Sequence, residues 1–239
     1  MFYIQNTKIR KKWEILVSIF PSLFFCLKYL PINQAIKIPI LVRKPKLVQL
    51  KGSVKIDCAP IRFGMIKMGF LESRLWPDNG IIWTVMGNVV FKGKAKIGSN
   101  SSIFVRKSGT LTFGENFENT AGLKIMCCCN INFGKTVSVG WDSVFMDSGL
   151  HPLVNTETKQ QKKCYGPISI GDYNWFGLQC LVMHSVNTPN RCIFAGRTVV
   201  TRGGDYQSYC VHGGTPVKVL SRNVMRDFAN DVISDYTNS

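Results

Sequence analysis

The stretch ISIGDYNWFGLQCLVMHSVNTPNRCIFAGRTVV, residues 168–200, decides the fold. Within it a mostly apolar residue recurs at every sixth position, and these markers are Ile170, Phe176, Val182, Thr188, Phe194 and Val200. A second run with the same spacing comprises Cys127, Phe133, Val139 and Phe145. A period of six is neither that of a helix nor that of a simple strand. It predicts a solenoid in which a short strand and a turn recur every six residues, and three such units close one triangular coil.

Glycine directly follows several of the markers, at Gly134, Gly140, Gly171 and Gly177. We expect the marker side chains to fill the prism and the glycine to let the backbone turn the corner with the least steric cost. Neighbouring coils then stack through backbone hydrogen bonds, and the two ends of the stack need caps. The spacing of Val224, Phe228 and Val232 predicts an amphipathic helix for the C-terminal cap.

The composition is that of a folded protein with a strong excess of positive charge. The chain has 239 residues, of which 45% are hydrophobic, and this excludes a disordered chain. Thirty Lys and Arg stand against 14 Asp and Glu, which gives a formal charge of +16. Such a charge requires an anionic partner: nucleic acid, a membrane surface or a polyanionic small molecule. Without a recognised nucleic-acid-binding motif, no nucleic-acid partner is predicted.

Residues 1–50 hold nine of the basic residues and a single acid, Glu14. Between these bases lies the apolar run 15–27, which is too short to span a membrane. Glu14 borders the run and no small-x-small cleavage site follows, unlike in a secretory signal. One interpretation is a segment that lies on an anionic membrane surface. The other is a hairpin of short helices packed on the main domain, and the two are compatible.

The nine cysteines favour the reducing cytoplasm, because without a secretory signal an odd number need not pair. Three of them, at 127–129, are consecutive, and no CxxC spacing occurs. We interpret them as small apolar filling residues, and no metal site is predicted. The expected location is the cytoplasm, with peripheral contact to the inner face of the cell membrane.

Three segments carry a family resemblance. IGDYNWFG at 170–177 resembles the "IGDNVWIG" signature of hexapeptide-repeat acyltransferases, and FAGRTVV at 194–200 resembles their "GAGSVV" segment. HGGTPVKVL at 212–220 resembles the "AGNPAKVI" segment that follows their last coil. The resemblance covers about residues 85–225. The N-terminal block, with YLP at 29–31 and RFG at 62–64, looks like the extension of the surface-polysaccharide acetyltransferases in this group.

The resemblance implies a left-handed parallel β-helix that assembles as a homotrimer, with acetyl-CoA bound in the groove between neighbouring prisms. It also suggests a division of the chain. Residues 1–85 form a basic N-terminal extension and the start of the solenoid, and residues 86–205 form the β-helix, with a loop ejected at about 151–169. Residues 206–239 form a segment that contacts the coenzyme, followed by the capping helix.

His151 is the candidate catalytic base. It ends the second run, after which the polar segment 154–164 leaves the solenoid. The family carries its catalytic histidine in a "D-x-D-x-H" segment at this point: Asp147 matches the first Asp, whereas Gly149 replaces the second. His151 would take the proton from an attacking hydroxyl, and Asp147 would hold the imidazole tautomer. Alternatively, His151 has a structural role, as a corner residue that hydrogen-bonds to a carbonyl.

The resemblance also implies which residues bind the two substrates. The set for coenzyme A comprises Trp175, Gly177, Ala195, Gly196, Arg197, Pro216 and Lys218. Gly196 would let the ligand approach a backbone N–H that stabilises the oxyanion, and Lys218 would lie near the phosphates. His184 and Asn155 are assigned to the acceptor, although a surface role also fits His184. His212 lies within the third motif, where a coenzyme contact and a plain turn are both compatible.

Three functions remain. The first is acetyl-CoA-dependent O-acetylation of a sugar hydroxyl in a bacterial surface polysaccharide or its precursor. The second is N-acetylation of an amino sugar, or acetylation of another small acceptor, on the same scaffold. The third is a non-catalytic basic solenoid that binds a membrane. The His151 segment and the motif at 212–220 favour an enzyme over the third.

Overall fold

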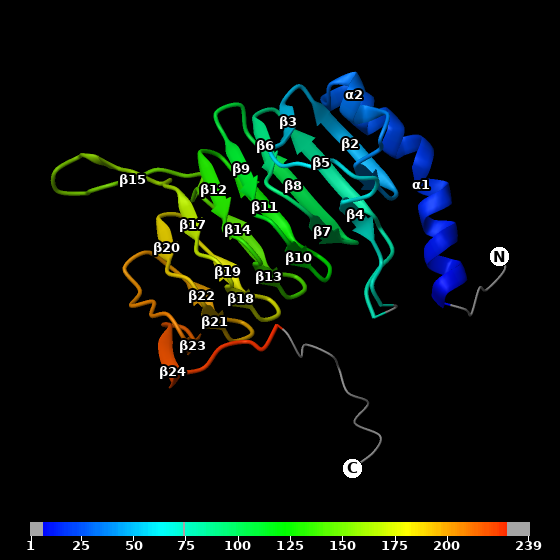
Figure 1. The fold of residues 1–239 in the computed structure, drawn as a ribbon. Helices are drawn as coiled ribbons and strands as arrows, with labels where there is room; N and C mark the ends of the chain where they lie inside the picture. The colour runs from blue at the N-terminus through cyan, green and yellow to red at the C-terminus, as the bar shows by residue number, and fades with distance from the viewer. Residues whose placement is uncertain (1–6, 74, 229–239) are drawn as a thin grey trace, which may run out of the picture.

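Three parallel β-sheets form the faces of a prism in the computed structural model, which describes residues 7–73 and 75–228 (Figure 1). The first sheet contains, in spatial order, β1 (Ile40–Val42), β4 (Ile66–Phe70), β7 (Ala95–Gly98), β10 (Phe117–Asn119), β13 (Ser138–Val139), β18 (Trp175–Phe176), β21 (Cys192–Phe194), β23 (Cys210–Gly213) and β24 (Lys218–Arg222). All its neighbours are parallel except β24, which runs antiparallel to β23.

The other two faces repeat the same arrangement. The second sheet contains β2 (Pro45–Leu50), β5 (Ile81–Val85), β8 (Ser101–Val105), β11 (Lys124–Cys127), β14 (Val144–Met146), β19 (Leu181–Val182) and β22 (Val199–Val200). The third contains β3 (Ser53–Ile56), β6 (Asn88–Phe91), β9 (Thr110–Phe113), β12 (Asn130–Phe133), β17 (Ile168–Ile170) and β20 (Val186–Thr188). The predicted fold class, a left-handed parallel β-helix, is confirmed.

The register gives the length of a coil. Phe176 pairs with Phe194 and Val182 with Val200, so each partner lies 18 residues further on, which is three hexapeptides. Nearer the N-terminus the coils are longer, because residues are inserted at the corners: Leu47 pairs with Trp83. Parallel stacking already includes β1 to β5, so the first coils lie within the segment 40–85.

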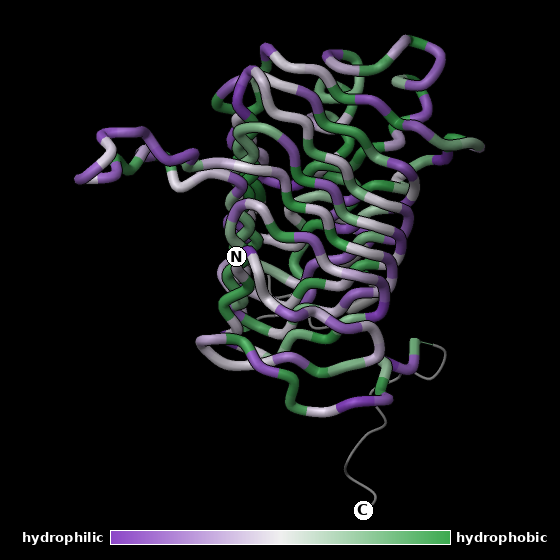
Figure 2. The backbone as a smooth tube through the Cα atoms, turned by 90° about the vertical axis from the view of Figure 1, so that its left-hand side faces the viewer, coloured by the Kyte–Doolittle hydropathy of each residue, from purple (hydrophilic) through white to green (hydrophobic). Residues whose placement is uncertain are grey.

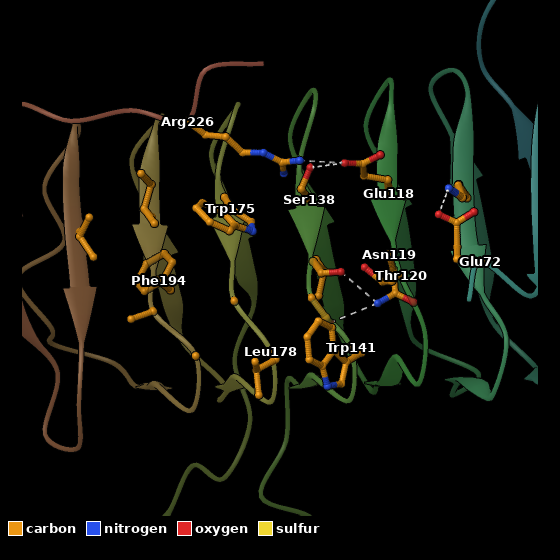
Figure 3. Close-up of a pocket in the computed structure, with 18 of the residues that line it drawn as sticks. Glu72, Glu118, Asn119, Thr120, Ser138, Trp141, Trp175, Leu178, Phe194 and Arg226 are labelled. Carbon is orange, nitrogen blue, oxygen red and sulfur yellow. Dashed lines mark hydrogen bonds and ion pairs between the residues drawn. The ribbon is translucent and has the colours of Figure 1, made fainter. Parts of the chain in front are cut away.

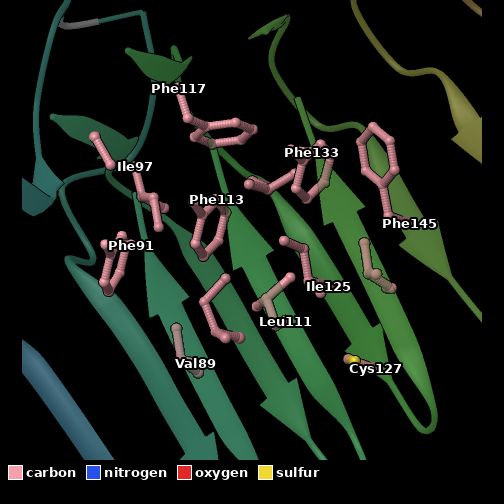
Figure 4. Packing of buried hydrophobic residues seen from close by; sticks show 14 of the residues in the cluster. Val89, Phe91, Ile97, Leu111, Phe113, Phe117, Ile125, Cys127, Phe133 and Phe145 are labelled. Atoms are coloured by element: carbon pink, nitrogen blue, oxygen red, sulfur yellow. The ribbon is translucent and has the colours of Figure 1, made fainter. Parts of the chain in front are cut away.

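The predicted markers fill the prism. All ten are at most 3% exposed, in both runs. The marker Phe133 continues a stack of rings along the axis that begins in earlier coils: Phe91, Phe113 and Phe133 have centroids 5.2 and 5.6 Å apart in nearly parallel planes (Figure 4). Phe176 and Phe194 continue this pattern at 4.7 Å. Because coils repeat along the axis, each ring covers the face of the next, and together they exclude water from the centre.

The predicted reason for the glycines was wrong. The corner residue with positive φ is the third after most markers, as at Tyr173 (59°) and Gln179 (55°), and neither Gly171 nor Gly177 has positive φ. A Cβ at Gly171 would lie 2.6 Å from the carbonyl carbon of Pro189 in the next coil. These glycines are therefore needed because the backbones of stacked coils approach too closely for a side chain.

The two ends of the prism are covered differently. At the N-terminal end lie a 23-residue helix, α1 (Thr7–Tyr29), and a single turn, α2 (Ile32–Ala35) (Figure 1). The predicted packing of this segment on the main domain is observed, with one long helix in place of two short ones. At the other end the described part of the predicted capping helix, residues 224–228, is irregular, and Val232 lies outside the described residues. Here β24 pairs with the last coil instead.

A hairpin leaves the prism between β14 and β17. Its strands β15 (Leu153–Val154) and β16 (Gln161–Lys162) pair antiparallel, and the arm projects from the side of the prism in both views (Figures 1 and 2). Its colouring is largely hydrophilic. A two-stranded arm with exposed side chains contributes no core, so its position suggests a role at the adjacent surface.

Candidate active site

His151 lies at the root of this hairpin, just after β14. Its backbone N–H donates to the carbonyl of Gly149 at 2.7 Å, and its side chain is exposed. Within the described part of the chain, the imidazole has no hydrogen-bond partner. Both ring nitrogens are therefore available to a ligand, as a general base requires.

His151 and His184 line one cleft of about 780 Å³, which we call the His151 cleft. The other lining residues are Gly149, Leu153, Lys162, Lys163, Cys164, Met183, Thr201 and Arg202. His184 follows β19, and its Nδ1 lies 3.2 Å from the hydroxyl of Ser185. The structure thus brings together the predicted catalytic base and the histidine that was assigned to the acceptor. Three cations at the cleft favour a neutral or acidic ligand over a cationic one.

Asp147 does not orient His151 in this structure. Its carboxylate is fully buried and accepts the backbone N–H groups of Cys128, Cys129 and Asn130 at 2.6, 2.8 and 2.8 Å. These three donors close the corner between β11 and β12, so Asp147 fixes a turn of the preceding coil. Burial, together with the negative charge of Asp147, raises the pKa of the Cys129 thiol to about 11. The predicted Asp147–His151 hydrogen bond is not among the bonds of the described residues.

Asn155 is engaged within the hairpin. Its Oδ1 accepts the N–H groups of Glu157 and Thr158, both at 2.9 Å. This arrangement stabilises the tip of the arm, and Asn155 is not among the residues that line the His151 cleft.

Four of the seven predicted coenzyme residues line a second depression. Trp175, Gly177, Ala195 and Gly196 lie along a groove of about 660 Å³ on the first sheet, which we call the Trp175 groove (Figure 3). Its lining is largely apolar in the centre. At one end the guanidinium of Arg226 lies over the Trp175 ring, 5.2 Å from the centroid, and 3.6 Å from the carboxylate of Glu118.

The other three predicted coenzyme residues lie elsewhere. Arg197 donates from Nε to Oε1 of Gln179 at 2.9 Å, on the exposed corner of the coil. Lys218 is exposed in β24, where it pairs with Gly213, and Pro216 lies in the turn between β23 and β24. None of the three lines the Trp175 groove.

His212 belongs to the core. It is fully buried and stacks on Phe194 with centroids 5.2 Å apart. Its Nε2 accepts the N–H of Gln207 at 3.0 Å, which leaves Nδ1 to donate to the carbonyl of Ile193 at 3.3 Å. Burial lowers the pKa of His212. The sequence carried a signal for this role: the period of six continues from Val200 to Tyr206 and His212.

The two depressions lie on different edges of one prism. The residues of the His151 cleft follow strands of the second sheet, whereas the Trp175 groove runs along the first sheet and the corner after it. They share no lining residue. Within the described residues no group of three or more His, Cys, Asp or Glu side chains is placed to hold a metal ion.

Comparison with known proteins gives relatives of one kind. The chain is 26% identical over 136 residues to the polysialic acid O-acetyltransferase of Escherichia coli O1:K1, which is 56% of this chain and 44% of that protein. It is 31% identical over 107 residues to a putative acetyltransferase of Dictyostelium discoideum, which is 45% of this chain and 55% of that protein. The chain therefore spans about half the length of these relatives. No family model matches it.

Solved structures with a similar fold include acetyltransferases. The polySia-specific acetyltransferase NeuO matches with a TM-score of 0.44 and 17% identity, over 80% of this chain and 85% of that one. A maltose O-acetyltransferase of Clostridium difficile 630 matches with a TM-score of 0.39 and 12% identity, over 94% and 92%. The predicted resemblance to the hexapeptide-repeat acyltransferases is confirmed by the sequence relatives and by the coils of the solenoid.

Proposed function

We propose that this chain transfers an acetyl group from acetyl-CoA to a sugar hydroxyl of a bacterial surface polysaccharide or its precursor. The observation that carries the proposal is the exposed imidazole of His151, unpartnered within the described residues, in a cleft at the root of an ejected arm. The acceptor class is supported by the E. coli relative, whose name gives polysialic acid as its substrate. The cations Lys162, Lys163 and Arg202 suit an acidic glycan.

His151 supplies the chemistry that a hydroxyl lacks. It removes the proton as the sugar oxygen attacks the thioester carbonyl, and returns that proton to the departing thiolate. The oxyanion that forms in between requires a donor. The backbone N–H of Gly196 is suited to this, because it lies in the Trp175 groove and makes no hydrogen bond among the described residues.

The coenzyme fits the Trp175 groove as an elongated, largely apolar chain. A groove of about 660 Å³ lined by Trp175, Leu178 and Phe194 has the volume and the apolar character that suit a pantetheine arm. Three glycines in the lining, Gly140, Gly177 and Gly196, allow the ligand to approach the backbone closely.

We further propose that copies of the chain assemble side by side as a homotrimer. On one prism the His151 cleft and the Trp175 groove occupy different edges, so base and coenzyme do not meet there. Three prisms around an axis would place the cleft of each beside the groove of its neighbour, and the site would be complete only in the assembly. A small amine acceptor is the second candidate, but the cations of the cleft disfavour a protonated amine.

The test is thiol release from acetyl-CoA with a panel of neutral and acidic glycans. His151→Ala is expected to abolish turnover, by about a thousandfold or more, while the affinity for acetyl-CoA stays unchanged. His184→Ala is the matched control: it alters the same cleft and is expected to raise the acceptor KM with a smaller effect on kcat. Undiminished turnover by His151→Ala would overturn the assignment of the base. Failure of the wild type to bind acetyl-CoA would overturn the proposed function.

A further inference from the structure

Helix α1 turns a largely polar stripe inward, beside the buried Phe25, and a stripe of apolar residues outward, the reverse of an ordinary surface helix. The inward stripe is Glu14, Ser18, Ser22 and Cys26, spaced by four, and all are buried. The outward residues are at least 49% exposed and comprise Ile9, Trp13, Leu16, Val17, Phe20, Phe24 and Leu27. Phe20 is 83% exposed. At 3.6 residues per turn these positions fall within about a third of the helix circumference.

The inward stripe is polar because it covers the open edge of a sheet. Strand β1 is the first strand of its sheet, and its outer backbone groups have no neighbouring strand. The hydroxyl of Ser22 accepts the N–H of Val42 at 2.8 Å, and the thiol of Cys26 donates to the carbonyl of Ile40 at 3.4 Å. Below them, Glu14 lies 3.8 Å from the guanidinium of Arg43. Side chains of α1 thus satisfy the edge that would otherwise pair with another chain.

The outward stripe has no such explanation. The backbone edge of β1 faces along the prism axis, so the opposite face of α1 points away from the protein (Figure 1). No part of the described chain covers it. Seven exposed apolar residues in one stripe, three of them aromatic, form a patch that a soluble monomer rarely presents without a partner.

The charge of the segment indicates which partner this is. Lys12 and Lys28 are exposed on α1, and Lys37 is exposed just after α2. The helical positions of Lys12 and Lys28 lie on either side of the apolar stripe. Two copies of this face pressed together would bring like charges into contact, which disfavours a second copy as the occupant. An anionic lipid surface offers apolar depth to the stripe and negative headgroups to its flanks.

We propose that α1 binds in the interface of an anionic membrane, with Trp13, Phe20 and Phe24 in the acyl boundary, and that the prism stands on it end-on. No described helix is long and apolar enough to cross a membrane, and the contact proposed here is with one leaflet. Every residue needed for it is already exposed, so binding requires no rearrangement of the solenoid.

End-on binding fixes the height of the His151 cleft, if the proposed function holds. His151 follows β14, the fifth strand of its sheet counted from β2. Four strand spacings and the thickness of a helix place the cleft about 30 Å above the lipid surface. An acceptor attached to lipid would then be modified several sugars away from its anchor, rather than at the lipid-linked sugar.

The experiment is flotation of the full chain with vesicles of phosphatidylcholine, with and without 30% phosphatidylglycerol in roughly the proportion of an anionic leaflet. We expect partition to the anionic vesicles, weakened by added salt. Phe20→Ser with Phe24→Ser is expected to reduce it at least tenfold. Leu75→Ser with Leu220→Ser, which removes two comparably exposed apolar residues elsewhere, is expected to leave it unchanged.

Other outcomes separate the alternatives. If the wild type does not bind anionic vesicles at any salt concentration, the proposal is overturned. It is also overturned if Phe20→Ser with Phe24→Ser lowers the mass of the oligomer, because a second copy of the chain would then be the occupant of the apolar stripe. Lys12→Glu with Lys28→Glu tests the charge without touching the apolar stripe, and should weaken binding to anionic vesicles only. Acetyl transfer to a soluble glycan should be normal in all these variants, so failure of the membrane proposal and of the proposed function are distinguishable.

Discussion

The imidazole of His212 stacks on the ring of Phe194, 18 residues earlier, with planes 27° apart. A histidine has thus taken the place of an apolar marker in the last coil, where burial lowers its pKa and two backbone groups bond to its ring nitrogens. Coil geometry repeats regardless of residue type, so a polar ring is accommodated if its two nitrogens find partners.

This stack gives the protein a pH-dependent stability. Because the pKa of His212 in the fold is below its ordinary value of 6.5, the unfolded chain binds a proton that the fold does not. The free energy of unfolding should therefore keep its full value above about pH 6.5 and decline as the pH falls below that value. Denaturant titrations between pH 5 and 8 measure this. His212→Phe should lose about 1–3 kcal/mol at pH 7.5, since the Gln207 N–H lacks an acceptor, and show a flatter pH profile. An equally steep profile in that variant would place the titrating group elsewhere.

Asp147 is expected to behave as a structural residue. Asp147→Ala leaves three backbone N–H groups without an acceptor and should lower the free energy of unfolding by about 3 kcal/mol or more. Asp172→Ala is the control, because Asp172 accepts a single N–H, from Lys135, at a more exposed corner, and should cost less than about 1 kcal/mol. The pH–rate profile of Asp147→Asn should keep its position. A shifted profile would restore the role of orienting His151.

Substituting glycines at stacked and unstacked positions should show whether glycine is required because neighbouring coils approach closely or because of its backbone conformation. Gly171→Ala introduces a Cβ 2.6 Å from the Pro189 carbonyl carbon, and we expect a loss of about 1–3 kcal/mol in denaturant unfolding. At Gly149 the nearest atom to a Cβ is 3.5 Å away, so Gly149→Ala should stay within about 0.5 kcal/mol of the wild type. Equal losses at both positions would contradict the explanation by coil contact.

The ejected hairpin should affect the acceptor and not the fold. Leu153 and Val154 in β15 are both more than half exposed, so replacing residues 154–161 by a short glycine-containing turn removes little buried area. The melting temperature should change by less than about 2 °C. The kcat/KM for a glycan should fall at least tenfold, and the affinity for acetyl-CoA should be unchanged. Titration with acetyl-CoA measures the coenzyme affinity, and initial rates on the same preparation measure kcat/KM for the glycan. A loss of acetyl-CoA binding alone would contradict the prediction, because it would place the arm at the coenzyme site.

Much of the candidate site could be predicted from the sequence. His151 was predicted as the catalytic base and His184 as an acceptor contact, and both line one cleft. Trp175, Gly177, Ala195 and Gly196 came from two motifs one coil apart, and stacking brings them to one groove. The position of Arg197 could not be predicted in this way. Its place in a motif does not show that its side chain hydrogen-bonds to Gln179 and does not line the groove.

The sequence by itself determined the coil. A period of six places every marker on the same side of the backbone, and this local pattern is enough to specify a prism of 18-residue turns with a filled centre. Tertiary structure decided what lies between coils. Asp147 reaches the turn at residues 128–130, and Ser22 reaches Val42, across distances in sequence that no local pattern reports. The same holds for the outward face of α1, since only the presence of a sheet edge beneath the helix explains why its apolar side is left exposed.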